Sequence, residues 1–264
     1  ADLVDYMKHI TNLNWDRNTQ ILQQAQELNS LLLANNIRPI FLKGTGNLLA
    51  GIYDDIAERM VGDIDFIFSK EDYPKVIKVL RNNGYSDVLK TDNIYPEFHH
   101  YQRLKNDNNI AAIEIHKELL IEKYAHEFNY SFVEKDSQVI KGVRVLSYAN
   151  KLNLSFIANQ INDNGFYYKK MALRNAYDVF LLSKKTNAKA ALNTLDKLSY
   201  PLHCFLAACF EIFNKADSLT YNPTAKIASY LSIFNSQFTS SKSIKRKTKR
   251  INIYLFIKFR LNII

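Results

Sequence analysis

Residues 41–68, FLKGTGNLLAGIYDDIAERMVGDIDFIF, contain the pattern that decides how the rest of the chain is interpreted. The stretch opens with an apolar run that ends in Lys-Gly-Thr-Gly and closes with Asp63 and Asp65 among large apolar residues. Successive side chains of a strand alternate between its two faces, so both aspartates are predicted on one face and their apolar neighbours in a core. Two adjacent carboxylates repel each other unless a cation lies between them. Mg²⁺ takes oxygen ligands and leaves positions open for phosphates, so the pair predicts a Mg²⁺ site, with Mn²⁺ as the alternative ion.

Length and composition indicate a folded protein. The chain has 264 residues, of which 47% are hydrophobic, enough for a core of one large domain or two smaller ones. Apolar runs stay below the ~18 residues of a membrane helix, and no signal peptide is recognisable at the N-terminus, so we expect no transmembrane segment and a cytoplasmic location. Cys204 and Cys209 match no metal-binding spacing and are expected to be buried small residues.

Positive charge is concentrated near the C-terminus. The formal net charge is +9, and the stretch SKSIKRKTKR at residues 241–250 contains no acid. The following residues, 251–263, are apolar at every odd position, which predicts a strand. The tail 241–264 could contact RNA or a membrane surface, or be a solvated charge run followed by a strand that packs on the body.

Hydrophobic periodicity predicts alternating helices and strands in the first half of the chain. The expected elements are helices at 16–35, 47–53 and 69–85 and strands at 37–42, 63–68, 98–105 and 110–117. This order predicts an α/β (α+β) domain, residues 1–145, with a small mixed sheet and flanking helices. Helical patterns at 146–161, 169–185, 191–213 and 224–234 predict a helical-bundle domain, residues 146–240, before the tail.

Glu114 and His116 are the next candidates for chemistry. Both lie on the same predicted face of the strand 110–117, whose other residues are mostly apolar. If this strand lies beside Asp63 and Asp65, Glu114 adds a third carboxylate, and three such groups can bind divalent ions that neutralise phosphate charge. The alternative is a surface glutamate. His116 could contact a phosphate, orient Glu114 or be a structural histidine.

A candidate anion site lies between the first predicted strand and helix. Lys43, Gly44 and Thr45 stand where backbone N–H groups can face a phosphate, although the segment is not a P-loop. Arg59, four residues before Asp63, could reach triphosphate oxygens or be solvated.

Together these residues carry a resemblance to a known family. The chain resembles the bacterial uncharacterised nucleotidyltransferase family of the DNA polymerase β-like nucleotidyltransferase superfamily in four elements, which occur in the same order. They are LKG at 42–44, an arginine at Arg59, GDID at 62–65 and EIH at 114–116. The similarity extends over roughly residues 15–185.

The resemblance implies transfer of a nucleoside monophosphate from an NTP, with release of pyrophosphate. It implies that Asp63 and Asp65 hold both Mg²⁺ ions, and that Glu114 completes this metal site near the acceptor hydroxyl. It also implies that Gly44 and Thr45 cradle the triphosphate. Two positions depart from the superfamily pattern, since a Gly-Ser or Gly-Gly pair is usual at 44–45 and aspartate is commoner at 114. Arg174 and Asp178, at helical spacing i and i+4, either pair with each other or face the nucleotide cleft, as in related enzymes.

The acceptor stays open on sequence grounds. Sugars, protein side chains and RNA are all used within the superfamily, and a fold does not select among them. Two rival functions are a catalytically inactive nucleotide-binding or regulatory module and an RNA-binding protein that uses the basic tail.

Overall fold

A seven-stranded mixed sheet forms the centre of the molecule. The computed structural model describes residues 2–88, 101–213 and 215–239, and the expected strand at 251–263 and the beginning of the expected strand at 98–105 lie outside them. The strand order is β3-β4-β5-β2-β1-β7-β6. The strands are β1 (Ile40–Phe41), β2 (Asp63–Ile67), β3 (Ser86–Asp87), β4 (Leu104–Lys105), β5 (Ala112–His116), β6 (Gln138–Ile140) and β7 (Val143–Val145). The predicted α/β class with a mixed sheet is confirmed.

The central strands follow the predicted alternation. In β2, Ile64 and Phe66 are fully buried, as are Ile113 and Ile115 in β5. β2 pairs with β5 in parallel and with β1 antiparallel. Parallel pairing of β2 with β5 is possible because the chain between them is long enough for a crossover that includes α3 (Tyr73–Asn82).

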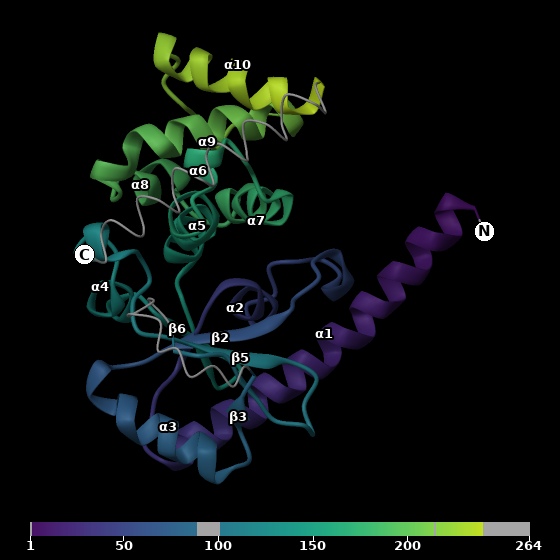
Figure 1. The fold of residues 1–264 in the computed structure, drawn as a ribbon, viewed down its shortest axis with the longest axis vertical. Coiled ribbons are helices and arrows are strands. Elements are labelled where there is room, and N and C mark those ends of the chain that lie inside the picture. The colour runs from purple at the N-terminus through teal and green to yellow at the C-terminus, as the bar shows by residue number, and fades with distance from the viewer. Residues whose placement is uncertain (1, 89–100, 214, 240–264) are drawn as a thin grey trace, which may run out of the picture.

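Helices cover both faces of the sheet. Figure 1 shows α3 below the strands and α5 to α10 above them, with α1 (Leu3–Ala34) crossing the lower part of the molecule. The upper helices are α5 (Tyr148–Ile157), α6 (Gly165–Tyr168), α7 (Leu173–Ser183), α8 (Ala188–Leu192), α9 (Ser199–Ile212) and α10 (Ala225–Thr239). A short helix α4 (Tyr130–Lys135), a π-helical turn η4 (Ala158–Asn162) and 3₁₀ turns η1 (Ile56–Glu58), η2 (Lys70–Asp72), η3 (Glu122–Tyr124) and η5 (Asp196–Leu198) complete the described elements.

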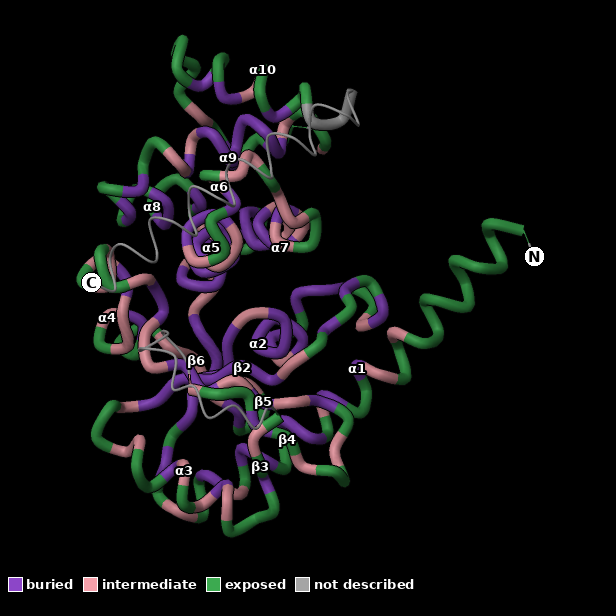
Figure 2. Tube along the Cα trace, viewed as in Figure 1, coloured by how far each residue is buried: buried purple, intermediate pink, exposed green. Residues whose placement is uncertain are grey.

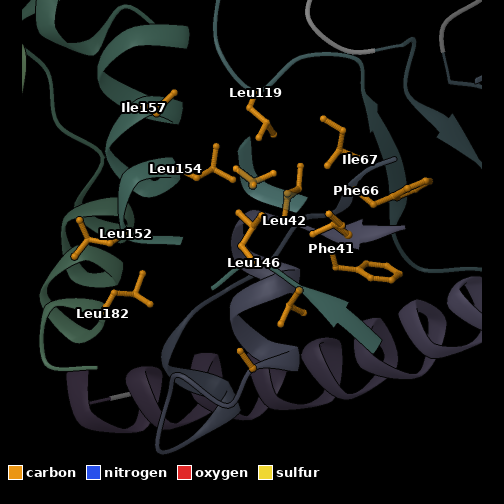
Figure 3. Packing of buried hydrophobic residues seen from close by; sticks show 14 of the residues in the cluster. Phe41, Leu42, Phe66, Ile67, Leu119, Leu146, Leu152, Leu154, Ile157 and Leu182 are labelled. Carbon is orange, nitrogen blue, oxygen red and sulfur yellow. The ribbon is translucent and has the colours of Figure 1, made fainter. Parts of the chain in front are cut away.

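One apolar layer joins the sheet to the helices above it. Figure 3 shows Leu152, Leu154 and Ile157 of α5 together with Leu42 and Leu146, which follow β1 and β7. All five belong to a single cluster of buried hydrophobic residues that continues through α7 and α9. The expected domain boundary near residue 146 therefore lies within a continuous core, and the division into domains stays a prediction.

The first helix is longer than its hydrophobic period indicated. The expected helix began at residue 16, whereas α1 begins at Leu3. The added turns are exposed and project away from the body (Figures 1 and 2), so no buried face marks them in the sequence. Within the described residues, no helix has both the length and the apolar character of a membrane-crossing segment.

Polar side chains of α1 hold both segments that lead into the central strands. Arg17 donates to the carbonyl oxygens of Val61 and Gly62, at 2.8 and 2.9 Å, just before β2. The buried Gln24 amide exchanges two hydrogen bonds with the backbone of Ala111, just before β5. These contacts satisfy backbone groups at the strand starts, and they fix the two strands relative to one helix.

The second helix corrects a prediction. Residues 43–46 were expected to form a break before a helix at 47–53, but α2 spans Lys43–Leu49 and includes them. The Gly46 N–H donates to the carbonyl of Leu42 at 2.8 Å. A Cβ at Gly46 would lie 2.6 Å from the carbonyl oxygen of Phe41. Glycine at this position permits close packing of the first helical turn on β1.

Replacing Gly46 by alanine is expected to destabilise the protein by about 1–3 kcal/mol or more, because the clash is with strand backbone that cannot rotate away. The matched control is Gly62→Ala, whose added Cβ meets no atom within 4 Å. The control is expected to stay within about 0.5 kcal/mol. Urea unfolding followed by circular dichroism measures both, and equal stability of the two variants would refute the packing argument.

The remaining differences from the sequence interpretation concern short elements. The helix expected at 69–85 is η2 followed by α3, and β3, β6 and β7 were not predicted. Strands of two or three residues are too short to show an alternating pattern. Cys204 and Cys209 are free and buried, as expected.

Candidate active site

Three carboxylates from two neighbouring strands meet on one face of the sheet. In the parallel register of β2 and β5, Asp65 lies opposite Glu114. Asp63 begins β2 two residues earlier, on the same face as Asp65. The exposed fraction of the side chain is 29% for Asp63, 8% for Asp65 and 13% for Glu114. The predicted convergence of the two aspartates with Glu114 is therefore present in the structure.

Two cations of the chain bind these carboxylates. The Lys43 ammonium lies 2.7 Å from Asp65 Oδ1 and 3.5 Å from Glu114 Oε2. The Arg103 guanidinium lies 2.9 Å from Asp63 Oδ2 and 2.7 Å from Glu114 Oε1. Three negative charges are thus matched by two positive ones, which leaves the cluster able to attract a further cation.

Burial and these charges shift the pKa values in opposite directions. Burial alone would raise the pKa of Asp65, but the Lys43 charge and a hydrogen bond to His116 hold it well below its usual range. For Asp63, burial dominates over the attraction of Arg103, and the pKa is raised. Burial would lower the pKa of Lys43, yet Asp65 and Glu114 together raise it. Asp65 and Lys43 are therefore charged at neutral pH, and Asp65 is available as an anionic ligand.

His116 belongs to the same cluster. Its Nε2 atom lies 2.9 Å from Asp65 Oδ1, and its side chain is 2% exposed. Burial and then the Lys43 charge lower its pKa, so the ring is neutral at pH 7. Donor atoms of Asp65, Glu114 and His116 all lie within 4.8 Å of one another.

The donor set fits a divalent metal ion. Two ligands at right angles on an octahedral ion with bonds of about 2.1 Å are about 3 Å apart. The Asp65–His116 separation of 2.9 Å matches this distance. The Lys43 ammonium already lies between Asp65 and Glu114, so a positive charge is stable at this position. A metal ion there would take the place of that ammonium.

The three carboxylates lie on the floor of a cleft between the sheet and the helices above it, whereas His116 is not among the residues that line this cleft. The cleft has a volume of about 260 Å³. It is lined from the sheet side by α2, the segment before β2, β2 and β5, and from the helical side by α5, η4 and α7. The lining residues are Lys43, Gly44, Arg59, Val61, Gly62, Asp63, Asp65, Arg103, Glu114, Leu154, Ser155, Ala158, Asn162, Asp163, Arg174, Asn175 and Asp178.

The expected anion-binding residues divide into two groups. Lys43, Gly44 and Arg59 line the cleft. Thr45 is fully buried, and its hydroxyl donates to the Asp63 carbonyl oxygen at 2.8 Å. The Thr45 side chain therefore holds α2 against the first residue of β2 and is turned away from the cleft lining.

Arg59 and Asp178 join the sheet side of the cleft to α7. The Arg59 guanidinium lies 3.2 Å from Asp178 Oδ2, and the Tyr53 hydroxyl donates to Asp178 Oδ1 at 2.7 Å. Burial raises the pKa of Asp178, and the Arg59 charge opposes that rise. Arg174 and Asp178 were expected either to pair with each other or to face the nucleotide cleft. Both residues lie in the cleft wall, and Asp178 pairs with Arg59.

Lys151 of α5 makes a second buried contact between the layers. Its ammonium donates to the Gly46 carbonyl oxygen of α2 at 2.7 Å. Burial lowers its pKa from 10.5 to about 7. The unfolded chain therefore binds more protons at this position than the folded protein between about pH 7 and pH 10.5.

This difference predicts a pH dependence of stability. Relative to Lys151→Met, the free energy of unfolding of the wild type is expected to rise with pH above 7, by up to about 1.4 kcal/mol per pH unit. Denaturant unfolding of both proteins at pH 7, 8 and 9 measures the difference. A difference that stays constant or shrinks with pH would show that Lys151 keeps its proton in the folded state.

Arg103 is the site residue that sequence analysis missed. It lies just before β4, which pairs with β5 in the register Leu104 with Ile113. The next pair in this antiparallel register is Arg103 with Glu114. The expected strands at 98–105 and 110–117 contain Arg103 and Glu114, but the bounds of two strands do not determine which residues lie opposite each other.

Most of the chain matches the sequence model of a known protein family. Residues 1–214 match the model of a family described as uncharacterised nucleotidyltransferase. The chain belongs to this family. Membership of this family supports nucleotidyl transfer as the general activity of the chain. A search of the curated proteins found no significant match.

Solved structures similar to this nucleotidyltransferase-family chain are distant in sequence. A solution structure of the antibiotic-resistance factor ANT(2'')-Ia has 11% identity and a TM-score of 0.47, and covers 74% of this chain and 99% of its own. A crystal structure of ANT(2'')-Ia with adenylyl-2''-tobramycin has 10% identity and a TM-score of 0.47, covering 69% and 98%. JHP933 from Helicobacter pylori has 14% identity and a TM-score of 0.39, covering 92% and 97%.

Proposed function

We propose that this chain transfers a nucleoside monophosphate from an NTP to a hydroxyl acceptor, releases pyrophosphate and depends on Mg²⁺ or Mn²⁺. The observation that carries the proposal is the set of three carboxylates, Asp63, Asp65 and Glu114, on the floor of a cleft that also contains Lys43, Arg59 and Arg174. Anionic groups that hold metal beside cationic groups that bind phosphate are what phosphoryl transfer requires.

The carboxylates are assigned the metal-binding role. Asp63, Asp65 and Glu114 would hold the ions, with a net negative charge that their two protein cations do not cancel. A bound metal ion would neutralise phosphate charge and lower the pKa of the acceptor hydroxyl. The hydroxyl oxygen forms a bond to the α-phosphorus, the bond from this phosphorus to the bridging oxygen breaks, and pyrophosphate leaves. Glu114, which faces the open cleft, is assigned as acceptor of the hydroxyl proton.

Cationic and small residues are assigned to the triphosphate. A metal ion between Asp65 and Glu114 would displace the Lys43 ammonium, whose side chain is 29% exposed and can turn toward a phosphate. Gly44 lines the cleft, and its lack of a side chain would let the triphosphate approach the backbone of α2. Arg174 would contact the triphosphate from the helical side, and Arg59 would contribute charge while it stays paired with Asp178.

The acceptor is proposed only as a hydroxyl group of a sugar, a protein side chain or RNA. The experiment that tests the function also identifies this class. The full chain is incubated with each α-³²P-labelled NTP, Mg²⁺ or Mn²⁺, and a cell extract, and the RNA, protein and small-molecule fractions are then counted. Label in one fraction, dependent on metal, is the expected result.

The rival assignment is an inactive nucleotide-binding module. It predicts metal-dependent binding of an NTP, measured by equilibrium dialysis, with no label transferred and no pyrophosphate released. That outcome would overturn the proposed reaction and leave the cleft as a binding site.

A further inference from the structure

Arg103 holds two of the three carboxylates that the proposed function assigns to the metal. Its guanidinium lies 2.9 Å from Asp63 Oδ2 and 2.7 Å from Glu114 Oε1, and its side chain is 47% exposed. We propose that Arg103 is a substrate-binding residue, whose guanidinium is released when Asp63 and Glu114 bind the metal ion and then binds a phosphate group of the acceptor. The inference rests on the proposed function and narrows the acceptor to a hydroxyl compound that also carries a phosphate.

The guanidinium and a metal ion compete for the same carboxylate oxygens. Asp63 Oδ2 accepts one hydrogen bond from Arg103, and Glu114 Oε1 accepts two, at 3.0 Å from Nε and at 2.7 Å from Nη2. A divalent ion held by these oxygens repels a guanidinium a few ångströms away. Because Arg103 is partly exposed, its ion pairs contribute little to stability, and their exchange for a metal ion costs little.

The sheet places Arg103 and Lys43 on different sides of the carboxylates. The strand order is β4-β5-β2-β1, and α2 directly follows β1. Lys43 of α2 contacts Glu114 Oε2, whereas Arg103, just before β4, contacts Glu114 Oε1. Glu114 therefore lies between one cation that reaches it from the β1 side and another that reaches it from the β4 side.

In-line displacement assigns the Arg103 side to the acceptor. The attacking and leaving oxygens lie on opposite sides of the α-phosphorus. The proposed function places the triphosphate at α2, with Lys43 and Gly44, and gives the hydroxyl proton to Glu114. The acceptor therefore approaches Glu114 from the side away from α2, which is the side of Arg103.

The chemistry of the guanidinium determines the class of acceptor. An arginine stays charged, and its fork of N–H donors matches the oxygens of a phosphate. Once Asp63 and Glu114 bind the metal ion, this positive charge attracts an anionic acceptor and repels one that carries an ammonium at the same place. The phosphate belongs either to the terminal nucleotide of an RNA or to a sugar phosphate, and in both it lies close to the hydroxyl.

Manganese binding tests the exchange without an activity assay. The full chain is freed of metal with a chelator and titrated with Mn²⁺, and free Mn²⁺ is measured by electron paramagnetic resonance. Arg103→Met is expected to bind Mn²⁺ at least about tenfold more tightly than the wild type, because the competing positive charge is gone. Arg81→Met is the matched control, since Arg81 forms a partly exposed ion pair with Asp87 outside the cleft. It is expected to leave the Mn²⁺ affinity unchanged.

Isothermal titration calorimetry with saturating Mn²⁺ tests the contact with the acceptor. The probes are a short RNA oligonucleotide, ribose phosphate and ribose. The phosphate-bearing probe that binds the wild type is expected to bind Arg103→Met at least about tenfold more weakly. Arg103→Lys keeps the charge without the fork of donors, so it is expected to lose less. RNA that binds alone identifies a nucleic-acid acceptor, and ribose phosphate that binds as well shows that a sugar phosphate is sufficient. Ribose is expected to show no dependence on Arg103.

The outcomes separate this inference from the proposed function. Mn²⁺ that binds Arg103→Met no more tightly than the wild type would overturn the exchange and leave the carboxylate site standing. Equal binding of the phosphate-bearing probes to the wild type and Arg103→Met, or no binding of either to the metal-loaded wild type, would overturn the role of Arg103 toward the acceptor. Absence of any Mn²⁺ binding by the wild type would contradict both the inference and the metal dependence of the proposed reaction.

Discussion

Replacing Asp65 by asparagine is expected to lower nucleotide transfer by 10²–10³-fold or more, which is the size of effect found when one group that stabilises transition-state charge is removed. The Asp65 side chain is 8% exposed and contacts both the Lys43 ammonium and the His116 ring. Asparagine keeps the shape of the side chain but removes the charge. The proposed metal site would then have one anionic ligand fewer, and phosphate charge would be neutralised less well. The labelled-NTP assay, with pyrophosphate release as a second readout, measures the loss.

The control for this variant is Glu118→Gln. Glu118 follows β5 and forms an exposed ion pair with Lys70, outside the cleft. Exposed pairs contribute about 0–1 kcal/mol, so this variant is expected to keep wild-type activity and stability. Circular dichroism spectra of both variants show whether the fold is retained. Full activity in a folded Asp65→Asn protein would place the reaction centre elsewhere.

Replacing Asp178 by alanine is expected to lower the free energy of unfolding by about 3–5 kcal/mol. Asp178 is 2% exposed and is the partner of the Arg59 guanidinium and of the Tyr53 hydroxyl. Its removal leaves a buried positive charge and a buried hydroxyl without their acceptor. The loss is large because the partners stay buried, and not because the ion pair itself is strong.

A double-mutant cycle isolates this effect. Arg59→Met and Asp178→Leu are measured singly and together, and the double variant is expected to lose less than the sum of the single variants, by about 0.5–3 kcal/mol. The comparison pair is Arg81 and Asp87, whose side chains are 35% and 30% exposed. Its coupling is expected to be below about 1 kcal/mol. Additive losses at Arg59 and Asp178 would show that the two groups do not depend on each other.

Strand alternation explains why part of the site could be predicted. Asp63 and Asp65 share a face because side chains alternate in any strand, and this holds whatever the strand packs against. The same argument placed Glu114 and His116 together. The pattern of large apolar residues between these polar residues showed which face is buried, so the two central strands and their two polar pairs followed from local sequence.

Pairings between distant segments could not be predicted in this way. Arg103 contacts Glu114 only because of the register between β4 and β5, and a two-residue difference in turn length changes that register. Arg59 pairs with Asp178, which is 119 positions away in the chain. No local sequence pattern identifies Glu114 as the partner of Arg103 or Asp178 as the partner of Arg59.

The sequence by itself determined the α/β class, the order of the central elements and the shared face of the acidic residues, because these depend on side-chain periodicity over a few residues. Tertiary structure decided that Asp65 lies opposite Glu114, that the Lys43 ammonium lies between them, and that residues 43–46 belong to a helix. Those features depend on strand register and on the close approach of Gly46 to β1. Both arise only when segments far apart in the chain pack together.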